Sequence, residues 1–381
     1  MNSTVTDGLG AAGRSKVGAT FWQRLRPWQV VLVVCLIYLG AVAIRYQNVL
    51  EFVRLGAQYA GIWDTYSRDA TGYDGQFAYY LALDPAHAAD HLDVPAYHTQ
   101  RILYPLLARI VSLGRADWLP YALLIINIGA LLVGTALLAS LLRAENVSRW
   151  YALSYGLFAG VLVAVRSSTT EPLAYALVIA AIWAAGRDRV VISAGLLLLA
   201  AFTKETTLLF AGGYALYYLL RRQWRRLLIV ISVTVVPFAI WQSMLYATFG
   251  VFGIGAGGAG STSFELLPFN GIWRIAADGP RVFLSVGIVP LAVAFLPTLW
   301  ALWQTSRDLR EDRLHPYVCL LFVNALVVPF LPFSTYREPL GLFRFLNGLL
   351  IAVLLYAAWH RAYRPLRYSL LWLIFGLLVL A

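Results

Sequence analysis

Apolar residues in this chain form long runs rather than the one-face patterns of soluble domains. The stretch 29–46 holds a single charged residue, Arg45, and further apolar runs recur to the last residue. A helix of about 20 residues crosses a bilayer. The pattern therefore predicts an all-α polytopic membrane protein with about 11 transmembrane helices, near 29–47, 119–142, 150–166, 172–186, 190–204, 206–220, 227–247, 281–303, 317–334, 339–359 and 368–381.

Composition strengthens this prediction. The chain is 60% apolar and 13% charged, with a mean hydropathy of +0.69, so it cannot cover a soluble globule with polar surface. The first run follows several basic residues, but it is long and no later segment marks a soluble mature domain, so we interpret it as a signal anchor. We expect a cytoplasmic tail, 1–28, and a single transmembrane domain, 29–381, that includes an outward loop, 51–118.

The charges predict the orientation. With the N-terminus inside, the inside segments hold 18 of the 30 basic residues and only 6 of the 19 acidic ones, as the positive-inside rule expects. The two spans 172–186 and 190–204 are short for a full crossing. The net charge of +11 does not indicate nucleic acid, because the basic residues are spread between apolar segments. We expect a multi-pass protein of the bacterial inner membrane, with a cytoplasmic N-terminus and an outward active face.

The first outward loop concentrates the ionisable residues. Segment 51–101 holds three of the five histidines and a set of aspartates, and 101–113 interrupts an apolar pattern with arginines, as an interfacial helix does. A second outward segment, 248–280, is rich in glycine, which favours a mobile loop. The aspartates are Asp64, Asp69, Asp74, Asp84, Asp90 and Asp93.

Asp74 is the most informative residue of this loop. It lies in GYDGQFAYYLALDP, where Asp74-Gly75 predicts a tight turn because glycine reaches positive φ without steric cost. The carboxylate would then project at the membrane surface between Tyr73 and Gln76. A general base needs only to reach an acceptor hydroxyl and to stay ionised near neutral pH. The alternative is a turn that merely enters a surface helix.

Further charges lie at the outer ends of later predicted helices. Ionisable residues at membrane depth are costly and usually mark a pathway or a site. Lys204 is one of only two lysines and lies between two apolar runs, where a cation can meet a phosphate. The alternatives are an ion pair with Glu205 or snorkelling to the interface. The full set is Arg166, Glu171, Lys204, Glu205, Arg337, Glu338 and Arg344.

Three other patterns have simpler explanations. Glu-Pro-Leu occurs at Glu171 and at Glu338, and an acid before a helix-starting proline suits the positive end of the helix dipole. The run 255–260 has the spacing of a dinucleotide fingerprint but follows no strand. His87 and His91, one turn apart among aspartates, are interpreted as a solvated helix face rather than as metal ligands.

Four motifs resemble the GT-C superfamily of membrane glycosyltransferases. They are YDGQF at 73–77, RILYPLLA at 101–108, TKE at 203–205 and REPLGLFRFLN at 337–347, and the layout of one outward loop followed by about ten spans is also similar. The resemblance implies transfer of a sugar from a polyprenyl-phosphate donor to a lipid or glycan acceptor of the cell envelope, on the outer face.

The resemblance also implies roles for residues. Asp74 would be the base, although many family members carry paired acidic residues where this chain has Gly75, so that Asp64 or Asp69 are alternatives. No metal ligand is assigned, and dependence on a divalent metal is left open. Donor phosphate would be bound by Lys204, Arg337, Arg344 and Arg166, and substrates would contact Tyr73, Gln76, Asp69, Glu171, Glu338 and Arg101.

Two other functions compete with this one. A transporter or flippase of a lipid-linked or small polar substrate would line a pathway near mid-membrane with polar residues, whereas the predicted span interiors are mostly apolar. A scaffold for envelope assembly would leave the loop charges dispensable. The charges gathered at one face favour the outward-facing enzyme.

Overall fold

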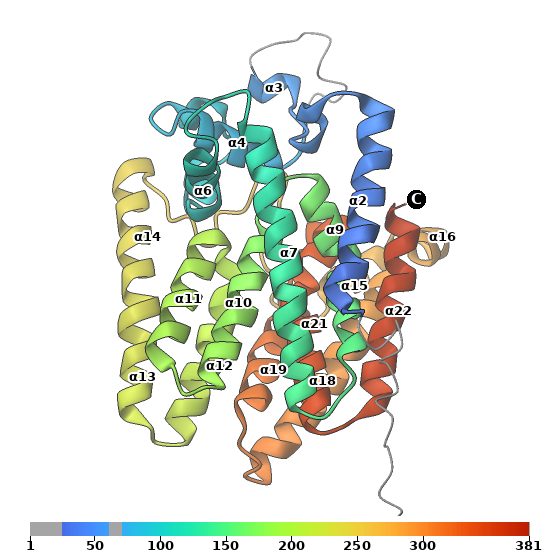
Figure 1. The fold of residues 1–381 in the computed structure, drawn as a ribbon. Coiled ribbons are helices and arrows are strands. Elements are labelled where there is room, and N and C mark those ends of the chain that lie inside the picture. Colours follow the sequence, from blue (N-terminus) through green and yellow to red (C-terminus); the bar gives the residue numbers. More distant parts are fainter. Residues whose placement is uncertain (1–24, 61–70, 381) are drawn as a thin grey trace, which may run out of the picture.

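The computed structural model describes residues 25–60 and 71–380, and the regular structure in these ranges is entirely helical. Most helices run side by side, and short helices cover one end of them (Figure 1). Within the described ranges, five helices are long and apolar enough to cross a membrane. The prediction of an all-α protein is therefore confirmed for these residues, and five helices have the length and hydropathy of membrane spans.

The five long helices differ in regularity. The helices 224–249 and 280–310 contain π-helical turns, where the helix bulges but continues. They are α2 (Pro27–Tyr46), α7 (Leu119–Ala144), α21 (Pro339–Trp359), the continuous helix of α13 (Trp224–Val230), η5 (Ile231–Val235) and α14 (Val236–Phe249), and the helix of α16 (Pro280–Val282), η6 (Phe283–Gly287), α17 (Ile288–Pro290), η7 (Leu291–Phe295) and α18 (Leu296–Arg310).

The remaining predicted spans are shorter helices, so the number of eleven crossings is not confirmed. The predicted span 150–166 is divided into three pieces, because Phe158 has an extended backbone, with ψ of 132°, and starts a new helix. These shorter elements are η3 (Arg149–Ala152), α8 (Leu153–Gly156), α9 (Ala159–Arg166), α10 (Glu171–Ala185), α11 (Val190–Thr203), η4 (Glu205–Thr207), α12 (Leu208–Leu220), α19 (Pro316–Val327), η8 (Val328–Phe330) and α22 (Tyr363–Leu380).

Helix α21 lies at the centre of the core. It packs against α9, α10, α19 and α22, and nearly all its side chains from Leu342 to Ala358 are buried. A Cβ atom at Gly160 of α9 would lie 2.4 Å from the carbonyl oxygen of Phe343, so glycine permits the close approach of these two helices. The approach brings the first turns of α21 to the start of α9.

The predicted outward loop folds into short helices over one end of the core, which we call the capped end (Figure 1). In α6, Tyr104 and Ala108 are buried whereas Ile110 and Val111 are exposed, as a helix at a surface requires. The elements are η1 (Val49–Phe52), α3 (Ala57–Ala60), α4 (Gly75–Leu83), η2 (Ala88–His91), α5 (Pro95–Thr99) and α6 (Leu103–Val111).

The glycine-rich segment, 248–280, packs onto this cap, whereas its composition predicts a mobile loop. A Cβ atom at Gly253 would lie 2.6 Å from the carbonyl oxygen of Ala96, and the Ala259 N–H donates a 2.7 Å hydrogen bond to Asp93 Oδ2. Glycine therefore serves close packing against α5. Two further short helices follow, α15 (Asn270–Ala277) and α20 (Phe333–Arg337).

The Asp-Gly turn is corrected by the structure. Asp74 precedes α4 with φ of −54° and Gly75 is the first helical residue, whereas the positive φ, 67°, belongs to Gly72. A Cβ atom at Gly75 would lie 2.0 Å from the carbonyl oxygen of Ser167. Glycine is needed here because α4 starts directly against the backbone that follows α9.

Replacing Gly75 by alanine is expected to destabilise the protein by about 1–3 kcal/mol, since a backbone carbonyl cannot move aside as a flexible side chain can. The measurement is the thermal unfolding midpoint in detergent micelles. Gly129 of α7 is the control, because a Cβ atom there meets nothing within 4 Å. Equal midpoints for the two alanine variants would contradict the close-contact role of Gly75.

Candidate active site at the capped end

A small pocket opens where α4, α5, α6, α21 and the turn before α10 meet. Its volume of about 20 Å³ has room for roughly one water molecule. Charged and polar side chains make up most of its wall. The pocket is lined by Asp74, Ala78, Leu81, His98, Arg101, Pro105, Thr169, Thr170 and Arg344.

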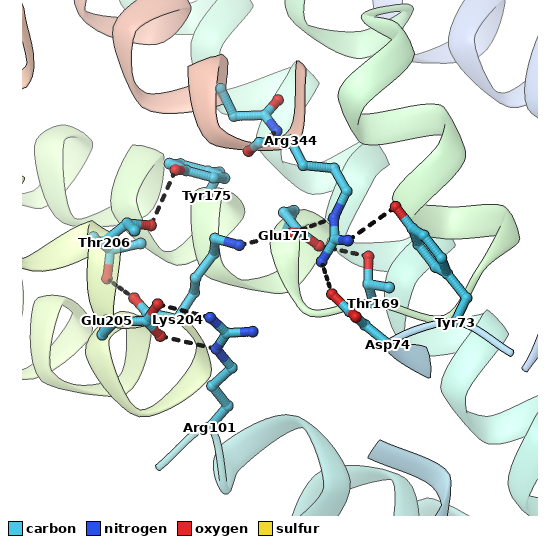
Figure 2. Close-up of polar contacts among 12 residues, drawn as sticks. Tyr73, Asp74, Arg101, Thr169, Glu171, Tyr175, Lys204, Glu205, Thr206 and Arg344 are labelled. Atoms are coloured by element: carbon cyan, nitrogen blue, oxygen red, sulfur yellow. Dashed lines mark hydrogen bonds and ion pairs between the residues drawn. The ribbon is translucent and has the colours of Figure 1, made fainter. Parts of the chain in front are cut away.

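Asp74 lies at the mouth of this pocket with its side chain 38% exposed. Its Oδ2 atom is 2.8 Å from Nη2 of Arg344 (Figure 2). Partial burial acts to raise the pKa of Asp74, but the charge of Arg344, with a smaller effect of cations such as Arg101, outweighs burial and leaves the pKa below its usual value. Asp74 is therefore ionised at neutral pH, as the sequence predicts.

Arg344 joins three residues from two segments of the chain (Figure 2). In addition to Asp74, its Nε donates to Glu171 Oε1 at 2.7 Å and its Nη1 donates to the Tyr73 hydroxyl at 3.0 Å. The Tyr73 ring also contacts the guanidinium of Arg54 at 5.1 Å from its centroid. Arg344 thus connects the start of the cap helix α4 to the start of α10.

Glu171 holds two cations at once. It is fully buried, and its Oε1 accepts from Nζ of Lys204 at 2.7 Å as well as from Arg344, while Thr169 Oγ1 donates to its Oε2. The pairing of Lys204 with Glu205, weighed from the sequence, does not form. Glu171 lies in the first turn of α10, as the motif predicts, but the hydrogen bonds of its carboxylate come from Lys204, Arg344 and Thr169 rather than from the helix backbone.

Arg101 and Glu205 form a second buried pair beside the first. Arg101 Nε and Nη2 donate to the two carboxylate oxygens at 2.8 and 2.7 Å, and Nη2 also donates to the Tyr97 hydroxyl. Burial acts to raise the pKa of Glu205, but the charge and hydrogen bonds of Arg101 outweigh it and lower the pKa to about 2. With Asp74, Glu171, Lys204 and Arg344, the cluster balances its positive and negative charges.

The Glu205 pair predicts an acid-dependent loss of stability. Because the pKa in the folded protein, about 2, lies below the ordinary 4.5, the stabilisation is complete above pH 4.5 and disappears as the pH falls toward 2. Thermal midpoints of the wild type and of Glu205→Gln should therefore differ most above pH 4.5 and converge below it. Glu311→Gln, in an exposed pair with Arg307, should change little at any pH. A constant difference for Glu205→Gln would refute the prediction.

Other candidates from the sequence lie outside the pocket wall. Arg166 ends α9 and interacts with Tyr38 of α2, and Arg337 is exposed beside the Phe333 ring.

The other predicted substrate contacts have different surroundings. Gln76 is buried, where it accepts from the Gly56 N–H and donates to the Thr71 carbonyl. Glu338 is exposed but near enough to Asp74 and Arg344 to interact with their charges. The alternatives Asp64 and Asp69 lie outside the described residues.

The sequence did not single out His98, Thr169 or Thr170, which also line the pocket. The one signal for His98 in the sequence is the nearby Asp93, but a separation of five residues does not predict a contact. In the structure, Asp93 Oδ1 lies 2.6 Å from His98 Nε2.

The other two histidines of the cap have separate partners: His87 pairs with Asp84, and His91 contacts the Tyr59 carbonyl. Within residues 25–60 and 71–380, no cluster of three His, Cys, Asp or Glu side chains suited to a metal ion is found.

Comparison of the chain with protein-family models, with curated protein sequences and with solved structures found no match in any of the three. The likeness to the GT-C superfamily therefore stays a prediction from four sequence motifs. The geometry of the pocket and its charges is the remaining guide to function.

Proposed function

We propose that this protein is a membrane glycosyltransferase of the GT-C type, which transfers a sugar from a polyprenyl-phosphate donor to a lipid or glycan acceptor at the outer face of the membrane. The observation that carries the proposal is the pairing of an ionised, partly exposed carboxylate, Asp74, with the buried cation Arg344 at one pocket. Sugar transfer from a lipid phosphate needs both a base and a cation for the leaving group.

The turn before α10 supports a phosphate-binding role. Thr170 lines the pocket, is only 7% exposed, and its Oγ1 makes no hydrogen bond to the described residues. It directly precedes α10, and the first N–H groups of a helix have no partner inside the helix and favour an anion. A phosphate at this turn would also face the guanidinium groups of Arg101 and Arg344, which line the same pocket.

The shared use of Arg344 suggests how the base becomes active. A donor phosphate that pairs with Arg344 competes with Asp74 for the same guanidinium. Release from Arg344 removes the largest influence that lowers the pKa of Asp74, so the carboxylate becomes a stronger base once donor is bound. Because the pocket has room for roughly one water molecule, a sugar can enter only if side chains of its wall move apart, and the separation of Asp74 from Arg344 is one such movement.

The proposed reaction is a single displacement at the anomeric carbon. The acceptor hydroxyl loses its proton to Asp74 while its oxygen forms the new bond to the sugar. The bond between the sugar and the phosphate oxygen breaks, and its electron pair stays on the polyprenyl phosphate, where Arg344 stabilises the charge. The leaving group is already an anion, so arginine side chains are chemically sufficient for this step.

The distribution of charge favours the enzyme over a transporter. The six charged residues of the cluster come from the cap, the ends of α10 and α11 and the first turns of α21, and all lie near one end of the core. A transport pathway requires polar groups toward the middle of the helices. A sugar-transfer assay separates the two, because movement of a lipid-linked substrate without transfer would refute the enzyme.

Arg344→Lys is expected to weaken donor binding on the order of tenfold to a hundredfold, since lysine keeps the charge but loses the fork of hydrogen bonds. The measurement is the affinity of the protein in membranes for polyprenyl-phosphate-linked hexose and pentose donors. Arg337→Lys is the matched control, because Arg337 is exposed and outside the pocket wall. Equal donor affinity in both variants would contradict the phosphate role of Arg344.

A further inference from the structure

We propose that His98, oriented by Asp93, acts through Asp74 as a proton relay, which accepts at Nδ1 the proton that Asp74 takes from the acceptor hydroxyl. The proposal rests on the proposed function and extends it with a proton path. No feature of the resemblance or of the sequence motifs points to His98.

The contact with Asp93 fixes the hydrogen on the imidazole. Asp93 Oδ1 lies 2.6 Å from His98 Nε2, and both side chains are almost fully buried. An ionised carboxylate only accepts hydrogen bonds, so Nε2 carries the hydrogen and the neutral ring keeps its lone pair on Nδ1. The same logic orients the histidine of a serine hydrolase.

The carboxylate is itself held in place. Asp93 accepts from the Val94 N–H at 2.6 Å and, through Oδ2, from the Ala259 N–H at 2.7 Å. Burial acts to raise the pKa of Asp93, but the contact with His98 and these two N–H groups outweigh it and lower the pKa. The glycine-rich segment that carries Ala259 therefore has a role in keeping Asp93 ionised and oriented.

Two aromatic rings hold the imidazole of His98 in place beside the pocket. The His98 ring lies against the Phe77 ring at 4.0 Å and the Tyr97 ring at 5.0 Å between centroids. Its Nδ1 makes no hydrogen bond to the described residues, although His98 is part of the pocket wall. His98, whose Nδ1 has no hydrogen-bond partner among the described residues, thus lines the same small pocket as Asp74.

The catalytic cycle gives such an acceptor a role. After transfer, Asp74 holds a proton that must leave before the next cycle, and an aspartate paired with Arg344 again favours the ionised form. The space of the pocket, sufficient for about one water molecule, permits that proton to pass to His98. The imidazolium then formed is stabilised by Asp93 and releases the proton to solvent. The charged or titratable groups around His98 are Asp93, Tyr97, Asp74, Arg101 and Arg344.

The test compares His98→Gln with His87→Gln, using the full chain in membranes and polyprenyl-phosphate-linked hexose and pentose donors. His87 also pairs with an aspartate, Asp84, at 2.8 Å, but it is exposed and outside the pocket, so its variant should behave as wild type. His98→Gln is expected to lower kcat about a hundredfold near neutral pH with little change in KM, and to lose the acidic limb of the kcat profile that titration of an imidazole produces. Added imidazole should restore turnover in His98→Ala.

Two results would overturn the role of His98 alone: a wild-type kcat and pH profile in His98→Gln, or nitrogen NMR spectra of ¹⁵N-histidine-labelled protein that place the hydrogen of neutral His98 on Nδ1. The NMR measurement needs no turnover and identifies the His98 signals by their loss in His98→Gln. Absence of sugar transfer in the wild type would instead overturn the proposed function, and the proton path with it.

Discussion

Replacing Asp74 by asparagine is expected to lower the rate of sugar transfer by about 10²–10⁴-fold, the contribution typical of a general base. Asparagine has nearly the same shape and keeps a hydrogen-bond acceptor for Arg344, but it cannot take the acceptor proton. The rate is measured in membranes with polyprenyl-phosphate-linked hexose and pentose donors. Donor affinity should not fall, because Arg344 is left without its competing carboxylate.

Asp84→Asn is the matched control for Asp74→Asn. Asp84 follows the last residue of the same helix, α4, and pairs with the exposed His87 rather than with a pocket residue. Normal turnover in Asp84→Asn together with lost turnover in Asp74→Asn assigns the effect to the pocket. Normal turnover in both variants, with both proteins correctly inserted, would remove Asp74 as the base.

Replacing Glu171 by glutamine is expected to destabilise the folded protein by about 3–5 kcal/mol, the cost of leaving a buried charge without its partner. Lys204 and Arg344 both lose the anion that they share, and neither side chain is accessible enough to regain water. The measurement is the unfolding free energy, from denaturant titration in mixed micelles. In this variant Arg344 keeps its ion pair with Asp74, whereas Lys204 loses its ion pair with Glu171. The buried charge of Lys204 is therefore the main source of the destabilisation.

The sequence offers a close control for Glu171→Gln. Glu338 begins the second Glu-Pro-Leu motif and directly precedes α21, but it is exposed and forms no ion pair within the described residues. Glu338→Gln should therefore cost less than about 1 kcal/mol. A double variant, Glu171→Gln with Lys204→Met, should recover part of the lost stability. Equal costs for the two glutamates would show that helix capping, and not charge pairing, explains both motifs.

The sequence by itself determined the class of the protein and the region of the candidate site. Long runs of apolar residues are stable where they are shielded from water, and this chain has too few polar residues to shield them within a soluble globule. In lipid, the backbone must form its hydrogen bonds within helices. Hydropathy therefore predicts a helical membrane protein. Charged residues next to apolar runs are energetically costly and usually mark a functional site. This rule identified four candidates from the sequence: Asp74, Glu171, Lys204 and Arg344.

Only the tertiary structure decided which charges meet. Lys204 is adjacent to Glu205 in the chain but pairs with Glu171, and Arg344 contacts residues about 170 and 270 positions earlier. Pairing follows from which helix ends lie side by side, and a close approach such as that of Gly75 to Ser167 depends on backbone positions that no local pattern encodes.

The same reason explains which candidates the structure leaves outside the pocket and which residues it adds. Gln76 has the polarity of a substrate contact, but its neighbours in space are backbone groups that use both ends of its amide. His98 has no distinctive sequence context, and becomes notable only because Asp93 and the glycine-rich segment meet it beside Asp74. Hydropathy acts on each segment separately and so can be read along the chain, whereas the selectivity of a polar site depends on distances of a few ångströms between segments that only the packed fold brings together.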